Sequence, residues 1–294
     1  MKVVVTGATG NLGGKLFAHL EASAWCDEVI GLDNRAAPSK SGSPNARHVI
    51  ADLTDPTDRR WRDTLTGAAA LVHFATRNPL PNCTWDEATE SLAMTSTLAD
   101  TALAAGVSRF VFASSNHVMG GYKDQPLAGT LSAGSLSTSM PPEPGTRTTT
   151  NGVSARPNAY ATSKLYGEAL AVSKARASGG RLTTVSVRIG WCLPGDNDPS
   201  AINSLALPLP PAEAAAANKA NPNDLGWFRG MWLSNRDLVG VMERAIRADA
   251  APWPAPGIVV NGMSANTGSV WDIATTRKLI GYAPQDDWVR VIGL

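Results

Sequence analysis

The first thirteen residues restrict the fold of this chain more than any other stretch. A β-branched run at residues 3–5 has the composition of a buried parallel strand, and it leads directly into Gly7, Gly10 and Gly13. An amphipathic stretch at residues 12–20 follows. Glycines let a backbone turn sharply and approach a pyrophosphate, whose charge then lies at the positive N-terminus of a helix. Strand, glycine turn and helix in this order predict a dinucleotide-binding βαβ unit.

A P-loop is the nearest alternative, and the sequence excludes it. Its pattern, ending at Gly14 and Lys15, would need glycine where Thr9 stands and serine or threonine where Leu16 stands. The expected phosphate-contacting residues are those of the glycine turn itself, namely Gly7, Gly10, Asn11, Leu12 and Gly13.

The end of the second predicted strand indicates which dinucleotide is bound. Residues 28–33 form this strand, and Asp33 closes it, with Asn34 next. A carboxylate here can accept hydrogen bonds from both ribose hydroxyls and would repel a 2′-phosphate, which favours NAD over NADP. Arg35 keeps NADP open as an alternative, because a guanidinium can pair with a phosphate. Asp52 and Leu53, after a third strand at residues 47–51, are expected beside the adenine.

Strands and helices alternate along most of the chain, which predicts a Rossmann-type, doubly wound parallel α/β sheet. We predict further strands at residues 70–75, 109–113, 182–189 and 257–260, and helices at residues 84–105, 157–177, 235–249 and 271–280. Residues 1–190 are expected to form the NAD-binding domain. Residues 191–294 are expected to form a smaller substrate lobe, with residues of about 232–262 returning to the Rossmann core.

Two segments interrupt the alternation. Residues 121–157 are rich in Gly, Ser, Thr and Pro, and we expect a mobile loop or a functional lid there. Residues 194–231 are rich in Pro and Ala, and we expect an insertion with one short Ala-rich helix.

Three side chains could turn a nucleotide-binding domain into an enzyme. Tyr160 and Lys164 are four residues apart on a predicted helix and therefore lie on one face. A neighbouring ammonium favours the phenolate, so Tyr160 is expected to accept a proton from an alcohol as a hydride leaves for the nicotinamide. Ser115 follows the fifth strand, at the sheet edge where ligands of such folds gather, and is expected to hydrogen-bond the substrate oxygen.

Together these motifs resemble the extended short-chain dehydrogenase/reductase superfamily, also described as NAD-dependent epimerases and dehydratases. The residues that carry the resemblance are Thr6-Gly-x-x-Gly-x-x-Gly13, Asp33, Asp52-Leu53, Val72-His-Phe-Ala75, Ser114-Ser115 and Tyr160-x-x-x-Lys164. Within it, the sequence is most similar to bacterial uronate dehydrogenases, through Phe112-Ala-Ser-Ser-Asn-His117, Val187-Arg-Ile-Gly-x-Cys192, Trp232-x-Ser-x-x-Asp237 and Gly262-x-Ser-Ala-Asn266 with Trp271-Asp272.

The resemblance implies an NAD-dependent oxidation of a secondary alcohol or a sugar hemiacetal, with uronate to aldarolactone as the specific case. It places Ala75 at the cofactor and Asn78, Ser115, Asn116 and His117 at the sugar. It also implies that Arg188 grips a substrate carboxylate, which a guanidinium fork suits. The two interrupting segments depart from the family pattern, and both flank the expected substrate site.

Alternative functions remain open at this point. A sugar epimerase shares the fold and the Ser/Tyr/Lys set, whereas Asn116 and His117 argue against a dehydratase. An NAD sensor without catalysis would not need the Tyr160 and Lys164 pair. A dehydrogenase or reductase of another cyclic or aromatic alcohol or ketone is the main competitor, since the chain has nine tryptophans.

Charge and composition exclude other classes of partner. Net charge is +1 and charged residues make up 17% of the chain, with no basic stripe that would suit nucleic acid or a membrane surface. Three scattered cysteines indicate reduced thiols and a cytoplasmic location, and four separated histidines give no metal site. We therefore expect a small-molecule substrate, with a homo-oligomer as an open alternative.

Overall fold

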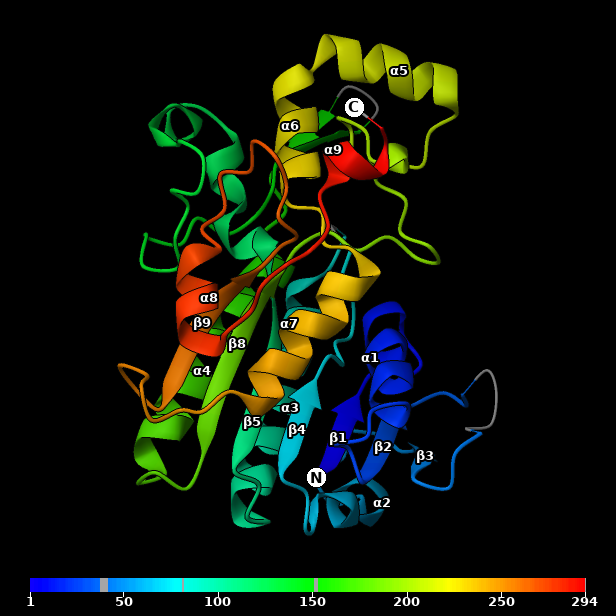
Figure 1. Ribbon diagram of the computed structural model, residues 1–294, viewed down its shortest axis with the longest axis vertical. Coiled ribbons are helices and arrows are strands. Elements are labelled where there is room, and N and C mark those ends of the chain that lie inside the picture. Colours follow the sequence, from blue (N-terminus) through cyan, green and yellow to red (C-terminus); the bar gives the residue numbers. More distant parts are fainter. Residues whose placement is uncertain (38–41, 81, 151–152, 294) are drawn as a thin grey trace.

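A seven-stranded parallel sheet organises the computed structural model, which describes residues 1–37, 42–80, 82–150 and 153–293 (Figure 1). The strand order is β3-β2-β1-β4-β5-β8-β9. The strands are β1 (Lys2–Thr6), β2 (Glu28–Asp33), β3 (Ala46–Ile50), β4 (Ala70–His73), β5 (Arg109–Ser115), β8 (Thr183–Ile189) and β9 (Gly257–Gly262). The order reverses between β1 and β4, the place where ligands bind in doubly wound sheets.

Helices cover both faces of the sheet because alternate strand residues point to opposite sides. Val3 and Val5 of β1 pack with α1 (Asn11–Glu21), α7 (Asn235–Arg247) and α8 (Ala274–Ile280) in one buried cluster. Val4 packs with α2 (Arg59–Arg62), α3 (Trp85–Ala104) and α4 (Ala159–Ala177) in a second. The doubly wound α/β fold expected from the sequence is confirmed.

A third apolar cluster lies outside the sheet. Its buried members include Met119, Leu136, Trp227, Trp232 and Trp271, which come from both interrupting segments and from the C-terminal region. Helices α5 (Pro211–Ala220), α6 (Pro222–Gly230) and α9 (Trp288–Val291) gather beyond the carboxyl ends of the strands (Figure 1). Several tryptophans are therefore core residues of this cluster.

The two interrupting segments contain more regular structure than the sequence indicates. The first holds the 3₁₀ helices η2 (Asn116–Lys123) and η3 (Leu127–Thr130) and a short antiparallel hairpin of β6 (Thr148–Thr150) and β7 (Val153–Ala155). Residues 151 and 152 lie outside the described residues. The second holds η4 (Pro199–Ala201), the expected Ala-rich helix α5, and also α6, which was not expected. Another 3₁₀ turn, η1 (Asp63–Leu65), follows α2.

The C-terminal region contributes the last strand of the sheet. Strand β9 pairs in parallel with β8, from Thr184 opposite Gly257 to Ile189 opposite Gly262. The domain boundary near residue 190 stays a prediction. Among the described helices, none is long and apolar enough to cross a membrane.

Candidate active site

The glycine turn after β1 has a backbone that other residues could not adopt. Gly7 has φ +68°, in the left-handed region, and a Cβ there would lie 3.0 Å from the backbone nitrogen of Ala75. A Cβ on Gly13 would lie 2.2 Å from the carbonyl oxygen of Gly7. The N–H of Gly10 donates to that same oxygen at 3.0 Å, and α1 begins at the next residue, Asn11. This tight turn at a helix N-terminus fits a pyrophosphate.

Asp33 connects the end of β2 to this turn. Its carboxylate accepts hydrogen bonds from the backbone N–H groups of Thr9 at 3.0 Å and Arg35 at 3.2 Å, and the residue is 6% exposed. The buried hydroxyl of Thr9 has no hydrogen-bond partner among the described residues. A carboxylate has further lone pairs for ribose hydroxyls, so the residues present fit the adenosine end of NAD. Arg35 and Asn34 are exposed at the same edge.

The other expected cofactor residues differ in what their side chains do. Leu53 is buried in the core, and Asp52 is exposed and accepts hydrogen bonds from the backbone and hydroxyl of Thr54. Asn11 donates to the carbonyl oxygen of Cys192 at 3.1 Å, and Leu12 packs against the core. The N–H of Ala75 donates to Thr6. Contacts of these residues with NAD stay predictions.

Ser115, Tyr160 and Lys164 come together as the sequence predicts. Ser115 ends β5, and Tyr160 and Lys164 lie in the first two turns of α4, which packs against β5. Ser115 neighbours Tyr160 and lowers the pKa of its phenol, and the ammonium of Lys164 lies 5.6 Å from the centre of the tyrosine ring. The same ammonium lies 4.9 Å from the ring centre of Phe112, a cation–π contact that stabilises its charge.

Burial opposes the charged form of both groups. Desolvation raises the pKa of Tyr160 to about 12, against the lowering effect of its hydrogen bond with Ser115. Desolvation also lowers the pKa of Lys164 to about 8, so the lysine is still mostly protonated at pH 7. The sequence led us to expect a lowered pKa for Tyr160. In the protein alone the pKa of Tyr160 is raised instead, because the loss of hydration in the pocket outweighs the lowering effect of Ser115.

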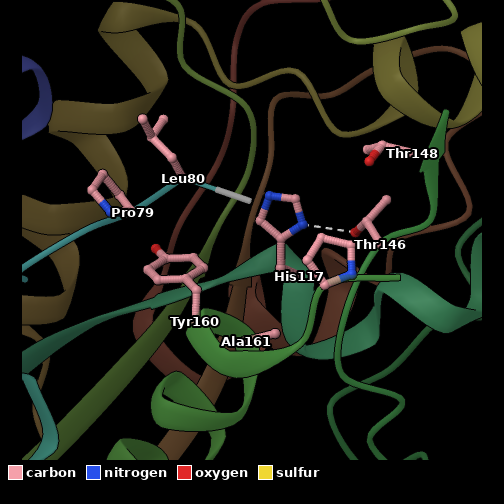
Figure 2. Close-up of a pocket in the computed structure, with 8 residues that line it drawn as sticks. Pro79, Leu80, His117, Thr146, Thr148, Tyr160 and Ala161 are labelled. Carbon is pink, nitrogen blue, oxygen red and sulfur yellow. Dashed lines mark hydrogen bonds between the residues drawn. The ribbon is translucent and has the colours of Figure 1, made fainter. Parts of the chain in front are cut away.

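A small pocket opens beside Tyr160 (Figure 2). Its lining residues are Pro79, Leu80, His117, Thr146, Thr148, Pro157, Tyr160 and Ala161. The Tyr160 hydroxyl points towards the side on which Pro79 and Leu80 lie. His117 meets the tyrosine ring edge-on at 6.1 Å, and its Nδ1 hydrogen-bonds the Thr146 hydroxyl at 2.7 Å. Desolvation lowers the pKa of His117 to about 4, so its imidazole is neutral at pH 7.

Two of the expected substrate residues use their side chains elsewhere. The Asn116 amide is buried and donates to the carbonyl oxygen of Ile189 at 3.0 Å. The Asn78 amide donates to Glu87 at 3.1 Å and to Asn82 at 3.2 Å. Among the described residues, neither lines the pocket. His117 does line it, and Ser115 reaches it through Tyr160.

Arg188 does not have the role that the sequence resemblance implied. Its Nε and Nη2 donate to the two carboxylate oxygens of Glu168 at 2.9 and 2.8 Å, and both residues are buried. Ser114 donates to the same carboxylate at 2.5 Å. The fork that a substrate carboxylate would need is therefore occupied by a carboxylate of the chain itself, and we correct the assignment of Arg188.

Several residues of the site were not foreseen from the sequence. Thr146 and Thr148 reach the pocket from the first interrupting segment, and Pro79 and Leu80 reach it from the loop after β4. No motif marks these four positions. Glu168 could have been found, because it lies one helical turn after Lys164, as Lys164 lies one turn after Tyr160.

Comparison with known proteins identifies the family. Residues 3–190 match the family model of the NAD dependent epimerase/dehydratase family, which covers more than half of the chain. The chain belongs to this family.

Relatives along the whole length are dehydrogenases. The chain is 30% identical over 296 residues to an L-arabinose 1-dehydrogenase (NAD(P)(+)) of Haloferax volcanii, with 99% of each chain covered. It is 25% identical to a uronate dehydrogenase of Pseudomonas putida, covering 97% of this chain and 84% of that one. A solved structure of a mutated uronate dehydrogenase, 26% identical, aligns over 99% of this chain and 84% of its own with a TM-score of 0.70.

These findings agree with the site. The chain is an NAD-dependent oxidoreductase that acts on CH–OH groups, as expected from the glycine turn, Asp33 and the Ser115, Tyr160 and Lys164 set. In the described part of the chain, no group of three or more His, Cys, Asp or Glu residues could hold a metal ion.

Proposed function

We propose that this enzyme oxidises the anomeric hydroxyl of a neutral aldose to a lactone and reduces NAD to NADH. The observation that carries the proposal is the chemistry of the pocket beside Tyr160. Its eight lining residues offer hydroxyl groups, a neutral imidazole and apolar surface, and none of them carries a full charge at pH 7. The buried guanidinium of Arg188 is already neutralised by Glu168. Such a pocket suits an uncharged sugar ring.

Each residue of the site has one task in this reaction. The C1 hydroxyl of the sugar would give its proton to the Tyr160 oxygen as C1=O forms, while the electron pair of the C1–H bond would leave as a hydride, for which bound NAD would be the acceptor. Ser115 holds the reacting oxygen. Lys164 favours the phenolate form of Tyr160. Bound NAD supplies the hydride acceptor and a positive nicotinamide charge, which further favours the phenolate.

The relatives support a sugar hemiacetal as the reacting group. The most similar of those described above is an L-arabinose 1-dehydrogenase, and an aldopentose has no carboxylate. We place the reaction in the cytoplasm, because the three cysteines are free thiols, of which Cys26 is buried.

A uronate is the second candidate, and the fold similarity to uronate dehydrogenase favours it. Its carboxylate would enter a pocket whose described lining has no cationic side chain. An ionised carboxylate that loses water without gaining a charged partner is strongly disfavoured. We therefore rank a neutral aldose above a uronate.

Three sugars with a common ring stereochemistry test this ranking. L-Arabinose, D-galactose and D-galacturonate differ at C5 by hydrogen, hydroxymethyl and carboxylate. We expect NADH formation with kcat/KM at least tenfold higher for one of the two neutral sugars than for galacturonate. A higher kcat/KM for galacturonate would establish the uronate alternative. NADH formation only with an aromatic or cyclic alcohol would contradict both sugar assignments.

A further inference from the structure

The two segments that interrupt the Rossmann pattern meet beyond the sheet. The ammonium of Lys123, in the first segment, pairs with Asp224 of α6, in the second, at 2.8 Å. Arg147, just before β6, donates to Asp124 at 3.0 Å. The first pair joins the two segments, and the second lies within the first segment. Residues of both segments line a second cavity.

This second cavity has about 130 Å³ of internal space, against about 30 Å³ for the pocket beside Tyr160. Its lining residues are Arg147, Thr148, Thr149, Ser204, Leu205, Asn221, Asp224 and Phe228. Hydroxyl, amide, carboxylate and guanidinium groups thus surround one aromatic side chain. Polar groups that both donate and accept, with an apolar wall, suit a polyhydroxylated ring.

One group in the cavity lacks the hydrogen bond that its burial requires. Ser204 is 2% exposed, and its hydroxyl has no partner among the described residues, whereas its backbone N–H donates to Asn218 at 2.8 Å. A buried hydroxyl without a partner costs free energy of about 1–3 kcal/mol. A ligand hydroxyl that reached the Ser204 hydroxyl would remove this cost, which favours a polar occupant over an apolar one.

The charged side chains around the cavity pair with one another, and this restricts the charge of the occupant. The cations Lys123 and Arg147 pair with the anions Asp124 and Asp224. A phosphate or a nucleoside diphosphate would need cationic partners that are not already neutralised. The occupant that fits is therefore uncharged.

The second cavity adjoins the pocket at Tyr160, since Thr148 lines both. We propose that it is a subsite for a second sugar unit, so that the enzyme oxidises the reducing end of a neutral disaccharide or longer oligosaccharide. This inference rests on the proposed function, because it takes the reducing-end ring to lie at Tyr160. The second unit lies between the β6 hairpin and α6.

Matched pairs of substrates test the subsite. D-Glucose is compared with cellobiose and maltose, and D-galactose with β-1,4-galactobiose, so each pair shares its reducing-end ring. We expect kcat/KM to be at least tenfold higher for one disaccharide than for its monosaccharide, mainly through a lower KM. Equal values, or rejection of all the disaccharides, would overturn the proposal.

Two variants test whether the preference for a disaccharide arises in the second cavity. Ser204→Ala removes the buried hydroxyl, and we expect the disaccharide-to-monosaccharide ratio of kcat/KM to fall about fivefold, the loss of one hydrogen bond. Its Tm should stay equal or rise, because an unsatisfied group is removed. Asn221→Trp fills the cavity from an exposed position and should lower the ratio further. As a control, Ser139→Ala changes an exposed serine of the first segment outside the lining, and the ratio should stay unchanged.

A binding measurement separates this proposal from the proposed function. Methyl β-cellobioside cannot be oxidised at its blocked C1, and its affinity for the enzyme with NAD is measured by calorimetry against methyl β-glucoside. Tighter binding of the disaccharide glycoside, weakened by Ser204→Ala, supports the subsite even when no aldose is oxidised. Equal binding of both glycosides overturns the subsite and leaves the reaction at Tyr160 as proposed.

Discussion

Lys164 is buried at 5% exposure, so the protein gives up stability to hold it beside Tyr160. Burial lowers its pKa from an ordinary 10.5 to about 8. Below pH 8 the lysine is charged in both the folded and the unfolded protein, and the folded state bears the desolvation cost. Between pH 8 and 10.5 the folded protein loses this proton first. The wild type therefore gains stability as the pH rises through this range.

Replacement of Lys164 by an apolar residue should remove the desolvation cost and so raise the free energy of unfolding. We expect Lys164→Met to be more stable than the wild type at pH 7 by about 3 kcal/mol, since one pKa unit corresponds to about 1.4 kcal/mol. The difference should disappear near pH 10.5, while activity is lost at every pH. Urea unfolding at pH 7 and pH 10 measures both values. The matched control Lys219→Met, on the exposed side of α5, should show no pH-dependent difference. A destabilised Lys164→Met at pH 7 would contradict the account.

Tyr160 can be tested separately from cofactor binding. Tyr160→Phe keeps the ring against His117 and removes only the hydroxyl that exchanges the proton. We expect kcat to fall by at least a thousandfold, within the range that a positioned general base contributes, while the affinity for NAD changes less than twofold. Fluorescence titration with NAD and the rate of NADH formation give the two numbers. Substantial turnover by this variant would remove Tyr160 as the base.

One face of helix α4 carries both the residues of the site and a residue that contacts the sheet. Tyr160, Lys164 and Glu168 follow one another at spacings of four residues, and Glu168 pairs with Arg188 of β8 and with Ser114 of β5. The spacing between Tyr160 and Lys164 made their proximity predictable from the sequence. The role of Arg188 was not predictable, because a guanidinium fork fits a substrate carboxylate and a protein carboxylate equally well.

The buried pair makes a prediction of its own. Glu168→Gln leaves the Arg188 charge without its counterion, and we expect a loss of about 3–5 kcal/mol in the free energy of unfolding. The double variant Glu168→Gln/Arg188→Met should recover most of that loss, because no buried charge remains. Asp63→Asn, which breaks the exposed pair with Arg59, should cost under about 1 kcal/mol. A Glu168→Gln variant as stable as the wild type would show that the pair is not buried as described.

At the scale of the whole molecule, the alternating strands and helices of the Rossmann core were predictable from the sequence. The structure of the two interrupting segments, which is specific to this chain, was not. Strand β2 and helix α3 were predicted to within a residue at each end, since periodicity and flanking signals define them. Helix α6 packs through Trp227 into the third apolar cluster, and the Lys123–Asp224 pair joins the two segments, whereas no periodicity in the sequence marks the β6 hairpin or α6. The substrate side of the site is built from those parts, which is why the cofactor was predictable and the pocket was not.

The central claim is that C1 of a neutral sugar gives up a hydride at Tyr160, and an isotope experiment tests it most directly. The enzyme is supplied with NAD and L-arabinose or D-galactose deuterated at C1, and the products are analysed by mass spectrometry. We predict one deuterium in each NADH and none at C1 of the lactone. NADH without deuterium would show that another carbon is oxidised and would contradict the account.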